Sequence, residues 1–248
     1  MNLKIIAKEG IKMMVKSSPS RILGVAFLLQ FFTSLISGVV LRPALIVPGD
    51  IRVSLINIAN NALLMRANIL LDMLTALGII FLGVILFLAL RNQSEKVALI
   101  ALGFYVLEAV LLAVSRIAAF ALVPISQEYA ATGYPGDLQV IGNVALQSMD
   151  FGGATLHMLV FGCGGILFYY LMYQSGIVPR ILSLWGLITT VFTLIATLFV
   201  LFGFQVSMVV YLPYVPFEFA VGIWILFRGI YDVSEQGHSG GAARRATT

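Results

Sequence analysis

The sequence predicts an all-α, polytopic membrane protein: a six-transmembrane-helix bundle with an N-terminal interfacial amphipathic helix. Three observations lead to this fold class. Of the 248 residues, 60% are hydrophobic and only 10% are charged, whereas water-soluble proteins carry roughly 25% charged residues. The apolar residues gather in six runs, each close to the roughly 20 residues that span a bilayer, and the mean hydropathy is +1.01. Most lysines and arginines lie at the ends of these runs.

The first 20 residues form a basic segment before the first apolar run. Lysine recurs every four residues, at Lys4, Lys8, Lys12 and Lys16. This spacing keeps the charges on neighbouring faces of a helix and leaves apolar side chains for the lipid side. We therefore expect a short interfacial helix on an anionic leaflet. The apolar run that follows, residues 22–41, is longer than the 7–15 residues of a signal-peptide core, so we predict that it is a retained transmembrane helix.

The six helices are expected in one transmembrane domain that covers residues 21–232. Their approximate bounds are 22–41, 67–90, 97–123, 151–173, 181–204 and 208–230. Turn residues and charges between the first two runs predict a loop with a helix on the membrane surface. Acidic residues and Pro124 predict a second loop from Pro124 to Asp150. Residues 233–248 are polar and glycine-rich, which predicts a flexible tail.

The basic residues predict the orientation. With six spans, eleven of them fall on one side of the membrane: Lys4, Lys8, Lys12, Lys16, Arg21, Arg91, Lys96, Arg180, Arg228, Arg244 and Arg245. Only three fall on the other side: Arg42, Arg52 and Arg66. Cytoplasmic loops are enriched in lysine and arginine, so we expect both termini in the cytoplasm. Because the net charge of +4 is spread over helix ends, it does not indicate nucleic-acid binding.

One charged pair is predicted inside the membrane. Glu108 and Arg116 both lie in the third apolar run, and Asp72 lies in the second. Counting about 1.5 Å per residue from the helix centres places Asp72 and Arg116 at a similar depth in the outer half of the bundle. We therefore predict an ion pair between Asp72 and Arg116. A purely architectural role, in which the pair fixes helix register, is the leading interpretation.

The sixth run carries a carboxylate beside two tyrosines. Tyr211 and Tyr214 precede Glu218 by seven and four residues, so the three side chains share a helix face. Pro213 and Pro216 remove backbone donors and predict a kink. In lipid, the freed carbonyl groups must find partners or line a wet cavity.

Glu218 and Glu108 are predicted at one depth, near the membrane midplane. Two carboxylates that lie close together favour one shared proton, and burial acts in the same direction. Such a pair could relay protons or bind a cation. It could equally consist of two neutral acids that hydrogen-bond within the bundle.

His157 and Cys163 are both single residues of their type in the apolar runs. A lone histidine is most often a hydrogen-bonded packing residue, and a lone cysteine is most often a small buried apolar residue. His157 with Asp72, Glu108 and Glu218 could in principle form a metal site. No spaced metal motif such as HExxH occurs, however, so no metal and no cofactor are predicted.

Several stretches resemble a bacterial membrane family called domain-of-unknown-function 4386. They read LLMRANILLDML, FYVLEAVL, YYLMYQSGIVPRILSLWGLI and FEFAVGIWILFRG, and the resemblance covers roughly residues 20–232. Its most specific part is the junction at residues 173–180, where this chain has Gln174 and many relatives have arginine. Other positions that look like the family pattern are Arg66, Asp72, Glu108 and Glu218. The resemblance implies a six-helix protein of the bacterial inner membrane, and it implies no activity.

Polar residues recur at helical spacing in several runs, for example Gln30, Ser34 and Ser37 in the first and Thr190, Thr193 and Thr197 in the fifth. Each helix therefore has one polar stripe, as a bundle with a polar interior requires. We expect a pocket that opens to the extracytoplasmic side. Its candidate residues are Glu108, Glu218, Asp72, Arg116, His157, Tyr214 and Tyr211.

Three functions are consistent with such a pocket. The first is small-molecule or proton-linked binding or transport, although no internal repeat, common in transporters, is visible. The second is a non-catalytic accessory or assembly protein in the membrane. The third, ranked last, is an enzyme acting on a lipid-like substrate, because no nucleophile–base spacing, phosphate loop or metal motif is present. The expected partners are the lipid bilayer and a small-molecule ligand.

Overall fold

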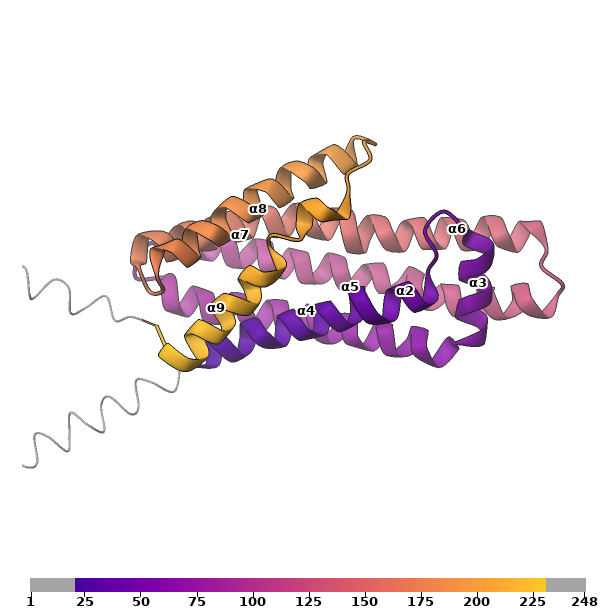
Figure 1. The fold of residues 1–248 in the computed structure, drawn as a ribbon, viewed down its shortest axis with the longest axis horizontal. Coiled ribbons are helices and arrows are strands. Elements are labelled where there is room, and N and C mark those ends of the chain that lie inside the picture. Colours follow the sequence, from indigo (N-terminus) through magenta and orange to yellow (C-terminus); the bar gives the residue numbers. More distant parts are fainter. Residues whose placement is uncertain (1–20, 231–248) are drawn as a thin grey trace, which may run out of the picture.

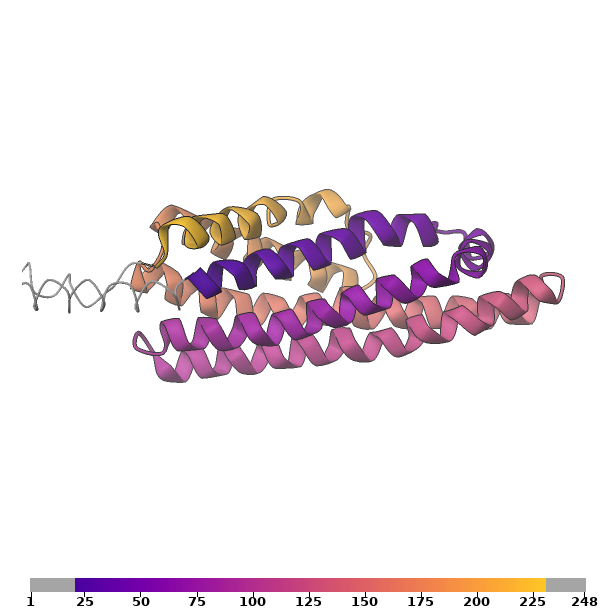
Figure 2. The same cartoon turned by 90° about the horizontal axis from the view of Figure 1, so that it is seen from below.

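The structure is a computed structural model that describes residues 21–230, and within this range it is a bundle of long helices without a β-strand (Figures 1 and 2). Six helices are long and apolar enough to cross a membrane: Arg21–Leu45, Ala62–Leu90, Glu95–Ala131, Gly136–Ser175, Arg180–Leu201 and Val209–Arg228. The predicted all-α membrane bundle is confirmed. The predicted interfacial helix and the polar tail lie outside the described residues.

The first span changes its helical geometry along its length. Residues 21–35 are α-helical, and the chain then continues as the π-helix η1 (Ile36–Leu41) and the short helix α2 (Arg42–Leu45). The surface helix expected next is present as α3 (Ile51–Asn60), with Asp50 as its N-cap, whose side chain accepts a hydrogen bond from Val53 N at 3.0 Å. In Figure 1, α3 lies across one end of the bundle.

The second, third and fourth spans form the longest part of the bundle. They are α4 (Ala62–Leu90), α5 (Glu95–Ala131) and the continuous helix made of α6 (Gly136–Asp150), η2 (Phe151–Leu156) and α7 (His157–Ser175). Figure 2 shows α5 and α6 projecting as a hairpin beyond the other helices. We call this end the hairpin end, and the opposite end, where the described part of the chain begins and ends (Figure 1), the termini end.

The predicted loop from Pro124 to Asp150 is wrong. Both sides of the segment are helical, and only residues 132–135 form a turn, in which Gly133 and Tyr134 have φ angles of 81° and 67°. Pro124 removes a single backbone donor from α5, and the helix continues because buried side chains hold both arms together. These side chains form an apolar cluster under α3, which includes Leu55, Leu122, Tyr129 and Met149.

The last two spans form a second hairpin, and the tip that joins them leans away from the rest of the bundle (Figure 1). Helix α8 (Arg180–Leu201) leads to the 3₁₀-helix η3 (Met208–Tyr211) and then to α9 (Val215–Arg228). The kink expected from Pro213 and Pro216 is present, because a turn at residues 212–214 separates the 3₁₀-helix η3 from α9. The carbonyl oxygen of Pro213 accepts a hydrogen bond from Nε1 of Trp185 at 3.0 Å.

Replacing Trp185 with phenylalanine is expected to lower the free energy of unfolding by about 0.5–1.5 kcal/mol, the usual net value of one hydrogen bond. The aromatic contact with Phe217, at a centroid distance of 6.1 Å, would remain. Unfolding of the purified protein in mixed micelles measures the change. A variant as stable as the wild type would show that the carbonyl of Pro213 needs no protein donor.

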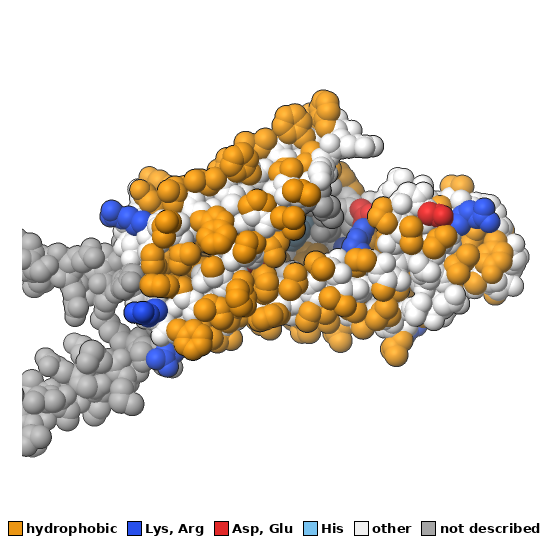
Figure 3. All heavy atoms as spheres, in the orientation of Figure 1, with side chains coloured by type: hydrophobic (Ala, Val, Ile, Leu, Met, Phe, Trp, Pro, Cys, Tyr) orange, Lys and Arg blue, Asp and Glu red, His pale blue; other side chains and the backbone are white. Residues whose placement is uncertain are grey.

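Packing places apolar side chains on the outside and polar side chains in the centre. Large apolar residues such as Ile117 and Phe120 are 70% and 59% exposed, and apolar side chains are spread along the face of the bundle shown in Figure 3. The predicted polar stripes face inward: Gln30, Ser37, Asn68, Asp72, Thr75, Thr190, Thr193 and Thr197 are all buried. A lipid-facing exterior around a polar interior is the pattern of a transmembrane bundle.

Candidate functional site

The predicted ion pair between helices α4 and α5 is confirmed. Nη1 of Arg116 lies 2.6 Å from Oδ2 of Asp72, and their side chains are only 8% and 11% exposed. Two residues that sequence reasoning did not assign to the pair complete it. Ser37 of η1 donates a hydrogen bond to Oδ1 of Asp72, and Asn68 of α4 donates to Oγ of Ser37 at 2.8 Å. We call Ser37, Asn68, Asp72 and Arg116 the ion-pair layer.

The rest of the Arg116 side chain rests on η2. Its Nε and Nη2 atoms donate hydrogen bonds to Oγ of Ser115 at 3.0 and 2.9 Å. A Cβ atom added to Gly153 would lie 2.1 Å from Nη2 of Arg116, and one added to Gly152 would lie 2.8 Å from Cβ of Ser115. The two glycines of η2 therefore let the guanidinium group lie directly against the helix backbone.

A second ion pair lies nearer the surface. Nη2 of Arg42 donates a hydrogen bond to Oδ1 of Asp150 at 2.6 Å, and these side chains are 33% and 40% exposed. Arg42 directly follows η1 and Asp150 directly precedes η2. The pair thus joins the ends of the two π-helical segments. No signal in the sequence pointed to it, because the partners are 108 residues apart and both were assigned to loops.

Glu108 has a different partner from the expected one. The sequence assigned it to Glu218, but Oε1 of Glu108 lies 3.4 Å from Nε2 of His157, a distance at the limit for a hydrogen bond. Glu108 is 3% and His157 is 9% exposed. Oε2 of Glu108 and Nδ1 of His157 are buried and have no hydrogen-bond partner within residues 21–230.

Glu218 is half-buried at the start of α9 and lies next to two tyrosines. Tyr214 donates a hydrogen bond to Oε1 of Glu218 at 2.9 Å, and the hydroxyl groups of Tyr214 and Tyr169 are 2.8 Å apart. Tyr211, which was expected beside Glu218, instead has its hydroxyl group 3.5 Å from Oγ1 of Thr197. We call Glu108, His157, Tyr169, Tyr214 and Glu218 the midplane layer.

Other buried polar atoms also lack a partner in the described part of the chain. They are Oε1 of Gln30, Oγ of Ser126 and Ser183, Oγ1 of Thr190 and Thr193, and Nε1 of Trp224. Roughly 90% or more of buried polar groups in proteins are hydrogen-bonded to protein or ordered water. A bundle interior with several unpaired groups is therefore suited to hold water or a polar ligand.

No metal site is formed by the described residues. Among residues 21–230 no group of three or more histidine, cysteine, aspartate or glutamate side chains is close enough to hold an ion. Asp72 is engaged by Arg116 and Ser37, and Cys163 is a half-buried free thiol. What the residues offer chemically is hydrogen bonding and the two carboxyl groups of the midplane layer.

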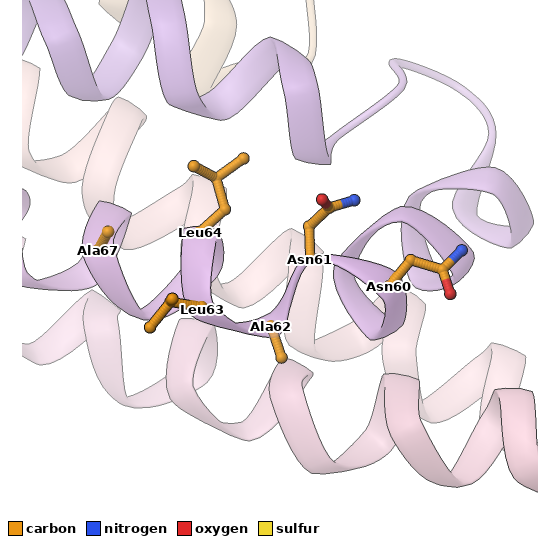
Figure 4. Close-up of a pocket in the computed structure, with 6 residues that line it drawn as sticks. All are labelled: Asn60, Asn61, Ala62, Leu63, Leu64 and Ala67. Carbon is orange, nitrogen blue, oxygen red and sulfur yellow. The ribbon is translucent and has the colours of Figure 1, made fainter.

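The surface has an opening and two shallow depressions. In Figure 3 the molecule is hollowed where η3 and the start of α9 diverge from the first span. A depression of about 460 Å³ lies at the break between α3 and α4, where Asn61 and Leu64 point to one side and Ala62 and Leu63 to the other (Figure 4). Another, of about 270 Å³, lies between α8 and η3. No residue of the midplane layer lines either depression.

Comparison with known proteins identifies the family. A family model described as Domain of unknown function (DUF4386) matches residues 22–229, which covers all six spans. No curated protein and no solved structure matches the chain. The chain belongs to the DUF4386 family.

Proposed function

We propose that this DUF4386 protein is a bacterial inner-membrane protein that binds a small molecule at its midplane layer and moves it across or within the membrane. The observation that carries the proposal is the state of Glu108. Its carboxylate is almost fully buried and contacts His157 at 3.4 Å, and Oε2 has no hydrogen-bond partner among residues 21–230. Ionisable residues inside a membrane are costly, and they usually mark a pathway or a binding site.

The two polar layers support different roles. In the ion-pair layer both oxygen atoms of Asp72 accept hydrogen bonds, and Arg116 is held by Asp72 and Ser115. A fully paired layer needs no ligand, and we assign it the structural role of fixing helix register. The midplane layer has unused hydrogen-bonding capacity on both Glu108 and His157. We therefore place the binding function there.

The orientation belongs to the proposal as well. The sequence assigns eleven lysines and arginines to one side of the six spans and three to the other, which favours cytoplasmic termini by the positive-inside rule. The hollow in Figure 3 then faces the outer half of the bilayer. A ligand would reach the midplane layer through it, from the outer leaflet or from the extracytoplasmic side.

Native mass spectrometry of the gently purified protein tests the proposal. We expect the wild type to retain a small molecule and the Glu108→Gln variant to lose at least nine-tenths of it, because glutamine keeps the shape and removes the charge. Gly103→Ala is the matched control: it lies in the same helix, and an added Cβ atom there would meet nothing within 4 Å. It should retain the molecule as the wild type does.

Two outcomes would contradict the proposal. One is a wild type that retains no small molecule from membranes in which it is expressed at its natural level. The other is a Glu108→Gln variant that retains as much as the wild type does. Either result, combined with reduced assembly of charge-neutralised variants, would favour the accessory or assembly function.

A further inference from the structure

The charges of the midplane layer narrow the class of ligand, an inference that rests on the proposed function. The layer contains two carboxylates, Glu108 and Glu218, and one imidazole, His157. The buried arginine of the bundle, Arg116, is already paired with Asp72. Within residues 21–230 no lysine or arginine contacts Glu108 or Glu218. The layer is therefore short of positive charge when its acids are ionised.

Glu218 belongs to a chain of hydrogen-bonded side chains that reaches into the buried interior. Tyr169, which is fully buried, connects to Glu218 through the hydroxyl group of Tyr214. In a medium of low dielectric constant, the negative charge of a carboxylate is strongly stabilised by a positive charge close to it. A cationic ligand would supply that charge.

Aromatic rings surround the Glu218 side of the layer. The ring of Tyr214 lies 5.0 Å from Phe161 and 5.6 Å from Phe217, and Phe217 lies 4.9 Å from Tyr169, measured between centroids. Aromatic faces attract ammonium groups through cation–π interactions, especially where water is excluded. A carboxylate among aromatic rings fits an organic cation in both charge and surface.

The same residues do not suit an inorganic cation. Calcium takes six to eight oxygen ligands and magnesium demands near-ideal octahedral geometry. The described residues bring no three acidic, histidine or cysteine side chains together. The neighbouring phenylalanine rings contain no oxygen atoms that could replace the water ligands of such an ion.

Access from the lipid favours a ligand with apolar substituents. Glu218 and Tyr214 are half-buried at the start of α9, where the molecule is hollowed (Figure 3). Exposed apolar side chains lie beside Glu218: the next residue, Phe219, is 41% exposed, and its ring centroid lies 6.3 Å from that of Phe32, which is 47% exposed. A molecule dissolved in the bilayer can therefore approach the carboxylate sideways.

We infer that the midplane layer binds a lipophilic organic cation, a protonated or quaternary amine or a similar onium ion with apolar arms. The positive centre lies between Glu218 and the aromatic rings, and the arms extend toward the hollow. Binding is non-covalent, and any proton held by either carboxylate is released to water.

Two probes of nearly equal size and opposite charge test this class. The full-length protein in detergent is dialysed to equilibrium against tetraphenylphosphonium, a cation, or tetraphenylborate, an anion. We expect the wild type to bind the cation at least tenfold more tightly than the anion. Glu218→Gln should weaken cation binding at least tenfold, whereas Gly103→Ala should leave it unchanged.

The wild-type comparison decides the inference even if the Glu218→Gln variant does not fold. Equal or tighter binding of tetraphenylborate by the wild type would overturn it. So would a folded Glu218→Gln variant that binds the cation as tightly as the wild type. A wild type that retains a neutral or anionic molecule in native mass spectrometry and shows no preference for tetraphenylphosphonium would refute the ligand class alone. A wild type that retains nothing and binds neither probe would refute the proposed function as well.

Discussion

Replacing Arg116 with methionine is expected to lower the free energy of unfolding by about 3–5 kcal/mol, the usual cost of removing one partner from a buried ion pair. The variant would leave the carboxylate of Asp72, a residue that is 8% exposed, without its arginine; among the described residues, the hydrogen bond from Ser37 would remain. It would also empty the space that the guanidinium group fills against Gly153. Equilibrium unfolding in mixed detergent and dodecyl sulfate micelles measures the change.

Two variants control this prediction. Arg42→Met breaks the half-exposed pair with Asp150 and should cost only about 0–1 kcal/mol, as exposed pairs do. The double variant Asp72→Asn, Arg116→Met should recover part of the loss, because no buried charge is left unpaired. If Arg116→Met is no more destabilising than Arg42→Met, the ion-pair layer does not hold helices α4 and α5 together.

Replacing Gly24 with alanine is expected to cost about 3 kcal/mol, the upper part of the usual range for overpacking. An added Cβ atom would lie 2.5 Å from N and 2.9 Å from Cα of Leu226, and 2.8 Å from the carbonyl oxygen of Gly222. All three are backbone atoms, which cannot rotate away. The first span and α9 would have to separate, and lipid offers little hydrophobic force to close them again.

Gly103→Ala and Gly38→Ala are the matched controls, since an added Cβ atom at either position meets nothing within 4 Å. Gly103→Ala should change the free energy of unfolding by no more than about 1 kcal/mol, and in the stabilising direction, because alanine favours helix. The same micelle titration serves for all three variants. A Gly24→Ala variant as stable as Gly103→Ala would mean that the first span and α9 do not touch closely in the membrane.

The ion pair could be predicted because helix geometry fixes depth. Asp72 and Arg116 each lie in a run whose centre the apolar residues define, and a constant rise per residue then places them at one level. The inward stripe of Thr190, Thr193 and Thr197 could be predicted for a related reason. Lipid offers a polar side chain no hydrogen-bond partner, so a polar stripe on a membrane helix is expected to face the other helices.

The start of the fourth span was predicted wrongly from the sequence. The sequence pattern began the fourth span at residue 151, whereas the observed helix runs from Gly136 to Ser175. His157 therefore lies near the middle of a 40-residue helix, beside Glu108. The error came from interpreting acidic residues and Pro124 as loop signals. Two helices that extend beyond the apolar part of the membrane can contain both acidic residues and a proline.

The π-helical segments and the pair between Arg42 and Asp150 had no signal in the sequence. A π-helix adds one residue per turn when tertiary contacts favour it, and here those contacts are Ser37 with Asp72 and Gly153 with Arg116. Local propensity does not contain that information. Pro213 and Pro216, by contrast, act through their own backbone, and the kink before α9 could be predicted from them directly.

The central claim is that the ion-pair layer is complete within the protein, whereas the midplane layer needs a partner from outside it. An electron cryo-microscopy map of the protein in lipid nanodiscs tests this most directly. The account predicts density that belongs to no protein atom within about 3.2 Å of Oε2 of Glu108 or Nδ1 of His157, and continuous protein density around Asp72 and Arg116. A map in which Glu108 and His157 are enclosed and hydrogen-bonded only by protein groups would contradict it.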